Sequence, residues 1–70
     1  MTNERQVQTG QRLRELRGEK PQREIAEAVG VSTMTISDIE RGKKCAGDDL
    51  KIRLAAYYGK TVGNIFFNEG

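Results

Sequence analysis

The chain has 70 residues, of which 36% are hydrophobic and 31% charged, and its formal net charge is +2 at pH 7. A chain of this size has room for one thin core, so we expect a single domain over residues 1–70 with its core at about 9–67. It contains no histidine and one cysteine, Cys45. It therefore lacks the commonest general base and any internal disulfide, and we expect neither an enzyme nor a cofactor. The mild positive charge permits nucleic-acid binding without requiring it.

No apolar run approaches the roughly 20 residues that are needed to cross a bilayer, and the opening "MTNERQVQTG" lacks the apolar core of a signal peptide. We therefore expect a cytoplasmic protein that does not interact with membranes. The sequence offers no second domain of useful length, so we expect no small-molecule ligand. Cys45 is predicted to be a loop residue without special chemistry, and the neighbouring Lys43 and Lys44 leave a redox role as an alternative.

Glycines divide the chain into short segments with helical periodicity. The first segment, "GQRLRELR" (10–17), places Leu13 and Leu16 on one face and is predicted to end near Gly18. The start of this helix is open, with Asn3 as a candidate cap. Its charged pairs, such as that of Arg12 with Glu15, are predicted to be a solvated face.

The second and third segments flank Gly30. The second is predicted to start at Pro21, whose missing N–H is tolerated in the first turn of a helix, and to stop at Gly30, where glycine favours a left-handed cap. The third begins after Ser32, a good N-cap, and ends at Gly42. The residues predicted to face inward are Ile25, Ala26, Val29, Ile36 and Ile39.

Two more helices follow. The fourth, predicted to be capped by Asp48 or Asp49, ends at Gly59, and the fifth is a short turn capped by Thr61. Their apolar and aromatic residues are predicted to complete the core: Leu50, Leu54, Tyr57, Tyr58, Val62, Ile65 and Phe66. We expect Phe67 to be exposed as a self-complementary dimer contact. Five short helices without a convincing strand predict an all-α fold.

The stretch "EIAEAVGVSTMTISDIERGKK" (24–44) joins two amphipathic segments by a tight turn. A small residue, Ala26, lets the second helix cross close to the first, and Val31 follows the glycine at the corner. This is the register of a DNA-binding helix-turn-helix, although a plain helical corner has the same turn. The outward residues of the following helix are mostly short and polar, as a helix in the major groove requires: Thr33, Met34, Ser37, Asp38 and Arg41.

From "GQRLRELR" through this stretch to "LAAYYGKTVGNIFF", the chain resembles the Cro/repressor (XRE-like) helix-turn-helix domains of phage and bacterial regulators. The resemblance covers roughly residues 9–67. It implies a lambda-repressor-like five-helix bundle that binds operator DNA, commonly as a symmetric dimer on an inverted repeat. It also implies an ion pair between Glu40 and Arg17 that ties the third helix to the first.

The resemblance assigns roles in DNA binding. Gln22 would direct its side chain and nearby N–H groups at a phosphate, and Ser32 would cap the third helix beside the DNA backbone. Thr33 and Met34 would lie deepest in the major groove. The remaining members of the set follow along the same face and the loop after it: Ser37, Asp38, Arg41, Lys43 and Lys44. The last three would bind phosphate and make the affinity depend on salt.

Three departures from the family pattern bear on the site. The link "KPQ" (20–22) is shorter than usual, which affects how Gln22 meets a phosphate. Thr9 occupies a position that is generally apolar. Asp38 stands where a neutral or basic residue is common, and its carboxylate would repel phosphate but accept a hydrogen bond from cytosine N4.

Two functions are therefore open. The first is a sequence-specific duplex-DNA-binding regulator, as a repressor that binds an inverted repeat as a weak dimer. The alternative is an antitoxin-like or anti-regulator module that keeps the fold but uses the third helix or the Phe66–Phe67 tail to bind a protein. The low net charge and Asp38 favour this alternative.

Overall fold

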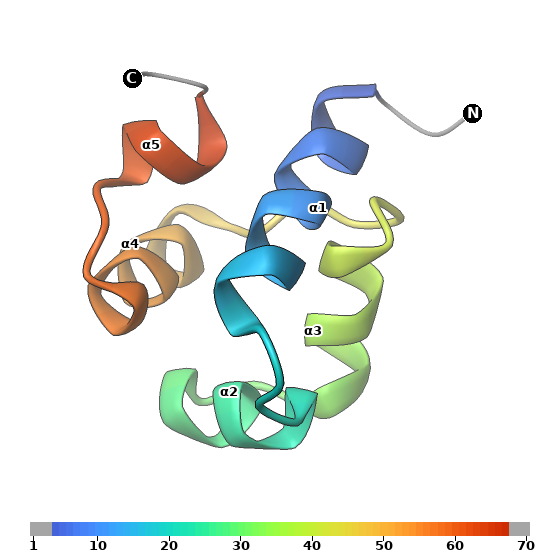
Figure 1. Ribbon diagram of the computed structural model, residues 1–70, viewed down its shortest axis with the longest axis vertical. Coiled ribbons are helices and arrows are strands. Elements are labelled where there is room, and N and C mark those ends of the chain that lie inside the picture. Colours follow the sequence, from blue (N-terminus) through green and yellow to red (C-terminus); the bar gives the residue numbers. More distant parts are fainter. Residues whose placement is uncertain (1–3, 68–70) are drawn as a thin grey trace.

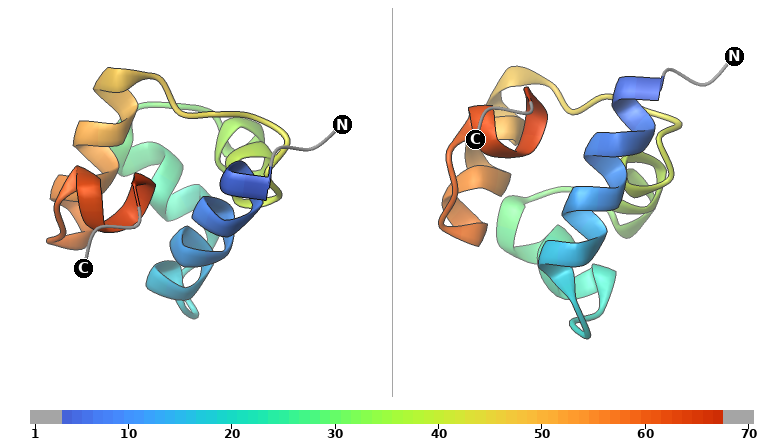
Figure 2. Two further views of the ribbon diagram at one scale, coloured as in Figure 1. Left: turned by 90° about the horizontal axis from the view of Figure 1, so that it is seen from above. Right: turned by 45° about the horizontal axis from the view of Figure 1, so that its top comes forward.

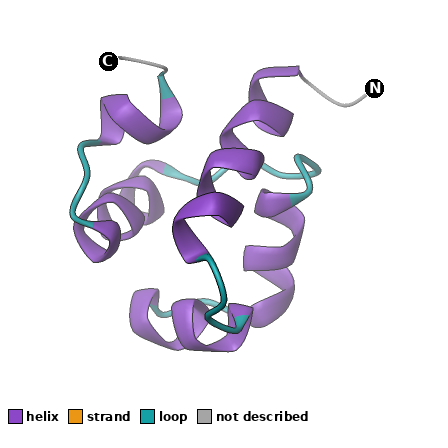
Figure 3. Ribbon diagram, in the orientation of Figure 1, coloured by secondary structure: helices purple, strands orange, loops and turns teal. Residues whose placement is uncertain are grey.

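The computed structural model describes residues 4–67, and within them the chain forms five helices joined by loops (Figure 1, Figure 3). The helices are α1 (Glu4–Arg17), α2 (Gln22–Val29), α3 (Thr33–Glu40), α4 (Asp48–Tyr58) and α5 (Val62–Phe66). No strand occurs in this part of the chain, which confirms the predicted all-α fold. The candidate cap Asn3 lies outside the described residues. None of the five helices has the length and apolarity to cross a membrane.

Each helix packs against at least two others: α1 against α3 and α5, α2 against α3 and α4, and α4 against α2 and α5. In Figure 1, α1 runs down the front of the molecule, with α3 on one side and α4 and α5 on the other, and α2 lies across the lower end. Figure 2 shows the same arrangement from two other directions. The first turn of α1, the loop that leaves α3 and the end of α5 all lie toward one end of the bundle (Figure 1). The helix α2 and the α2–α3 turn therefore lie at the end opposite to α5, and α3 runs from that turn along the side of the bundle (Figure 1).

Two predicted helix starts were wrong by one residue. Pro21 precedes α2 as its N-cap, because its backbone is extended (ψ 148°) while its φ of −69° already suits the helix that follows. Gly47 caps α4 without a side-chain hydrogen bond, so Asp48 and Asp49 lie in the first turn. Carboxylates are favourable there because they face the positive end of the helix dipole. The predicted cap of α5 is confirmed, since Thr61 Oγ1 accepts the Asn64 N–H at 3.0 Å.

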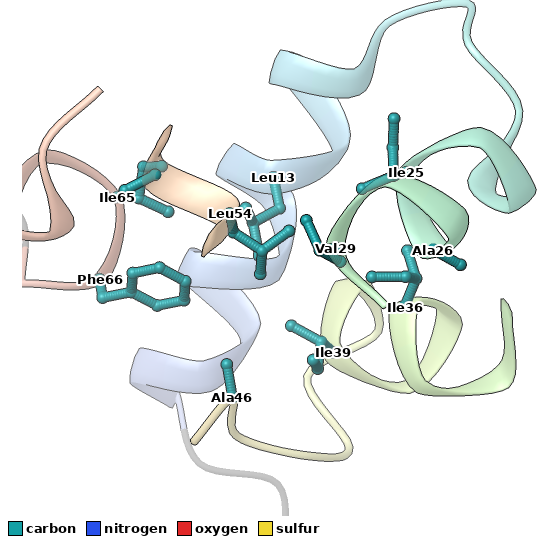
Figure 4. Packing of buried hydrophobic residues seen from close by; sticks show 11 residues of the cluster. Leu13, Ile25, Ala26, Val29, Ile36, Ile39, Ala46, Leu54, Ile65 and Phe66 are labelled. Atoms are coloured by element: carbon teal, nitrogen blue, oxygen red, sulfur yellow. The ribbon is translucent and has the colours of Figure 1, made fainter. Parts of the chain in front are cut away.

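Apolar side chains from all five helices and one loop form the core (Figure 4). The buried members are Leu13, Ile25, Ala26, Val29, Ile36, Ile39, Ala46, Leu54, Ala55, Ile65 and Phe66. The two tyrosines pack against them, with ring centroids 5.1 Å apart in an edge-to-face arrangement. These positions confirm the predicted inward faces, and Phe67 is 46% exposed as expected. The burial of Ala46 and Ala55 was not predicted, because alanine carries little periodic signal.

A glycine inside α1 sets the distance between α1 and α3. A Cβ on Gly10 would stand 2.3 Å from the Glu40 carbonyl oxygen and 2.6 Å from that of Ile39. The backbones of the two helices therefore meet with no room for any side chain at this position. The preceding residue, Thr9, is also buried, and α1 continues five residues before it. A glycine that resembled a boundary in the sequence is therefore a packing contact in the middle of α1.

Candidate nucleic-acid interface

The turn between α2 and α3 is built by backbone hydrogen bonds around Gly30. Gly30 has a φ of 77°, in the left-handed region that glycine adopts at little cost. The Ala26 carbonyl oxygen accepts the N–H groups of both Gly30 and Val31, the latter at 2.9 Å. Arg53 of α4 adds a hydrogen bond from Nη1 to the Val29 carbonyl oxygen at 3.3 Å. The carbonyl groups at the end of α2 therefore accept hydrogen bonds both from the turn and from α4. These hydrogen bonds define the direction in which the chain continues into α3.

Ser32 starts α3 as predicted. Its Oγ accepts the Thr35 N–H at 3.1 Å and lies 2.9 Å from the Thr35 hydroxyl. The cap satisfies an N–H that has no partner within the helix. From this start, Ile36 and Ile39 point into the core, and each is 3% exposed. The other side of α3 is thereby turned away from the bundle.

The outward side of α3 carries the residues predicted to meet bases. Thr33 is exposed, and Met34 is 66% exposed, the highest value among the large apolar side chains of residues 4–67. Ser37 and Asp38 are partly exposed one turn further along. An apolar side chain that projects into solvent from a mostly polar face fits a helix that meets thymine methyl groups. These four residues therefore lie together on one accessible face.

The basic residues predicted to meet phosphate follow the same face into the loop. Arg41 is the C-cap of α3, and Gly42 has a φ of 76° that reverses the chain. The Lys43 N–H then donates to the Asp38 carbonyl oxygen at 2.9 Å, which fixes the loop against the helix end. Arg41, Lys43 and Lys44 are all exposed. Three cations thus stand at one end of the polar face.

A hydrogen-bond network around the buried Glu40 carboxylate, at the end of α3, holds this face in place. The Glu40 side chain is 3% exposed, and its two oxygens accept Arg17 Nε at 2.8 Å and Nη2 at 3.0 Å. The predicted ion pair is therefore confirmed and has the bidentate geometry that arginine favours. The hydrogen bond with Glu40 raises the pKa of Arg17 above its ordinary value, and burial opposes that rise. Arg17 also donates Nη1 to the Lys20 carbonyl oxygen at 2.7 Å, which fixes the loop before α2.

Gln22 belongs to this network. Its Nε2 donates to Glu40 Oε1 at 3.0 Å, so its side chain is held against the end of α3. The predicted phosphate contact stays a prediction, with one N–H of the side chain already used. This link was not predicted, because Gln22 and Glu40 are 18 residues apart in the sequence. Tyr58 packs near the same carboxylate, and burial raises the pKa of Tyr58 to about 12, with a further contribution from the charge of Glu40.

Outside the polar face, one surface prediction was wrong. Arg12 was predicted to lie on a solvated face, but its Nη1 donates to the Ile65 carbonyl oxygen at 3.0 Å and so ties α1 to α5. Cys45 is exposed in the loop, as expected, and its Sγ accepts a hydrogen bond from Gln6 Nε2. Among residues 4–67, no group of three potential metal ligands lies close enough to hold an ion.

Comparisons with known proteins bear on the whole arrangement. Residues 11–64 match a family model described as helix-turn-helix. Two solved structures of the clp gene regulator ClgR from Corynebacterium glutamicum are similar to the chain, each with a TM-score of 0.81 and 29% sequence identity over 96% of the chain. The match spans 73% of one ClgR chain and 88% of the other. No curated protein matches the chain. Because the family model covers most of the sequence, the chain belongs to the Cro/C1-type (XRE-like) helix-turn-helix family.

Proposed function

We propose that the protein is a transcriptional regulator that reads a specific duplex DNA sequence with α3. The observation that carries this proposal is the exposed polar face of α3, which ends in three cations and is fixed by buried contacts on its other side. Family membership and the similarity to a gene regulator support DNA binding as the activity. The rigid support matters because base readout requires side chains held in a defined register.

In this proposal, Thr33 and Met34 contact base edges, the first through its hydroxyl or methyl group and the second through apolar contact. Ser37 and Asp38 contact bases one turn further along. Asp38 accepts a hydrogen bond from cytosine N4, so it selects a G·C pair at the expense of repulsion from nearby phosphates. Gln22 and Ser32, at the N-termini of α2 and α3, contact the DNA backbone. Arg41, Lys43 and Lys44 bind DNA phosphates.

We further propose that the protein acts as a repressor and binds an inverted repeat as a weak dimer. Half-sites about one helical turn apart would match two copies related by a twofold axis. Occupation of such a site inside a promoter would exclude the transcription machinery. A small bundle offers a small surface for pairing, so we expect the dimer to form mainly on DNA.

Selection of duplexes from a random pool tests the proposal. Purified protein is washed at about 0.1–0.15 M salt, where non-specific phosphate binding is weakened. We expect an inverted repeat to be enriched.

Two variants test the assigned contacts. Thr33→Ala should reduce discrimination at one base position by about 1–3 kcal/mol. Arg41→Ala should weaken binding to all sequences and reduce the salt slope, which is the slope of the logarithm of affinity against the logarithm of salt concentration, by about one unit in magnitude. Lys60→Ala, an exposed lysine before α5, serves as the control. The absence of any enriched sequence would contradict the proposal and favour the protein-binding alternative.

A further inference from the structure

A cleft of about 210 Å³ lies at the end of the bundle away from the α2–α3 turn. It is bounded by the first turn of α1, the loop after α3, the start of α4 and the end of α5. Its apolar floor includes Ile39, Ala46 and Phe66, which Figure 4 shows on three different elements at one side of the core. A cavity of this size is smaller than a typical drug-sized site and accommodates one large side chain.

Among residues 4–67, the charged side chains that line this cleft are all basic. Arg5, Lys44 and Lys51 line it, and none of its described lining residues is acidic. The whole chain has 12 basic and 10 acidic residues, so three cations at one cleft are a local concentration. Lys51 Nζ lies 5.1 Å from the centre of the Phe67 ring and 5.8 Å from that of Phe66. The Lys51 ammonium group therefore lies over the two phenylalanine rings, where it can contact a ligand that enters the cleft.

We propose that this cleft, defined here as the basic cleft, binds an acidic peptide segment of a partner protein with one aromatic or large aliphatic side chain in the cavity. Three cations from three separate elements match several carboxylates better than a single one. The apolar floor matches the anchoring side chain, which gains free energy by leaving water. The proposal goes beyond DNA binding and does not depend on it.

Two other occupants fit the basic cleft less well. A second copy in a symmetric contact would bring the same three cations face to face, because a twofold interface pairs a surface with itself. A DNA backbone would match the charges, but it has no compact apolar group for Ile39, Ala46 and Phe66. The proposal therefore assigns Phe67 to the basic cleft instead of to the dimer contact expected from the sequence.

A peptide-display selection on the 70-residue chain tests the proposal. We expect enrichment of peptides that combine several Asp or Glu residues with one aromatic or large aliphatic residue. Lys51→Glu and Phe67→Ser should each weaken binding of a synthesised peptide at least tenfold, while Lys60→Glu, the same charge change outside the basic cleft, should leave it within twofold. Circular dichroism melts establish that each variant is folded.

The single cysteine provides a local reporter. A trifluoromethyl tag on exposed Cys45 places a fluorine-19 NMR probe at the edge of the basic cleft, and we expect its resonance to shift on addition of the peptide. Peptides that bind folded Lys51→Glu as tightly as the original protein would overturn the proposal, as would a lack of acidic enrichment. Self-association that moves the tag without peptide would assign the basic cleft to a second copy. A tenfold loss of duplex affinity in Lys51→Glu without peptide binding would assign it to phosphate.

Discussion

Glu40 joins three elements through one carboxylate. It accepts hydrogen bonds from Arg17 of α1 and Gln22 of α2 while it lies at the end of α3. A buried carboxylate is costly unless its charge and its lone pairs are matched, and here both conditions are met. No buried side-chain polar atom among residues 4–67 lacks a hydrogen bond. The network therefore holds the helix-turn-helix against α1.

Glu40→Gln tests the energetic contribution of this charge with little change in volume. The substitution leaves the Arg17 guanidinium, whose side chain is 17% exposed, without its counter-ion. We expect the free energy of unfolding in urea to fall by about 3 kcal/mol. Glu27→Gln is the matched control, because the Arg23–Glu27 pair is 80% and 69% exposed, and it should cost less than about 0.5 kcal/mol. Equal effects of the two substitutions would contradict the assigned role.

Tyr58 makes stability depend on pH in the alkaline range. Its pKa is about 12 in the folded protein and about 10 when unfolded, so between these values the folded state holds a proton that the unfolded state has lost. Its contribution is complete below pH 10 and is lost as the pH rises to 12. Because Tyr58 is only partly buried, we expect a loss of roughly 1–2 kcal/mol. Urea unfolding at pH 8 to 12 should show this extra slope in the original protein and not in Tyr58→Phe, and parallel profiles would exclude it.

At the scale of the helices, the contact between α1 and α3 depends on Gly10. In a helix interior, replacing glycine by alanine normally stabilises the helix by about 1 kcal/mol. At this position its Cβ would meet two backbone carbonyl oxygens, which cannot rotate away as a side chain could. The two helices would have to separate and would lose core contacts on both sides.

We therefore expect Gly10→Ala to destabilise the protein by about 3 kcal/mol, although it raises helix propensity. Gly47→Ala is the control, because nothing lies within 4 Å of a Cβ at that position and its φ is −69°. It should cost no more than about 1 kcal/mol. Thermal and urea unfolding of the two variants measure the difference, and a stabilised Gly10→Ala would show that α1 and α3 are not in close contact.

For the whole molecule, the two proposals meet at Lys44, which is assigned to a DNA phosphate and also lines the basic cleft. An acidic segment in the cleft would neutralise this cation and bring negative charge toward the DNA. We expect a saturating peptide to raise the duplex Kd about 3- to 10-fold in fluorescence anisotropy, with a lower salt slope. This prediction rests on both proposals. Simultaneous binding without any change in Kd would show that Lys44 does not serve both partners.

The sequence determined most of the fold because its signals are local. Apolar spacing, Ser32 and Thr61 as caps and glycine at position 30 each act within one or two helical turns, so they define five helices and the α2–α3 turn without reference to the rest of the chain. The exposed face of α3 follows from the same periodicity. The Arg17–Glu40 pair also came from the sequence, through the family pattern that its spacing fits.

What only the tertiary structure decided involves residues far apart in the chain. Gly10 resembles a helix boundary until the backbone of α3 is placed against it. Arg12 resembles a solvated residue until α5 presents the Ile65 carbonyl oxygen. The basic cleft gathers Arg5, Lys44 and Lys51 from segments that are separate in sequence. Local sequence patterns predict which side of a helix is buried. Which element covers that side depends on how all five helices pack together, and this packing creates the close contacts and the basic cleft.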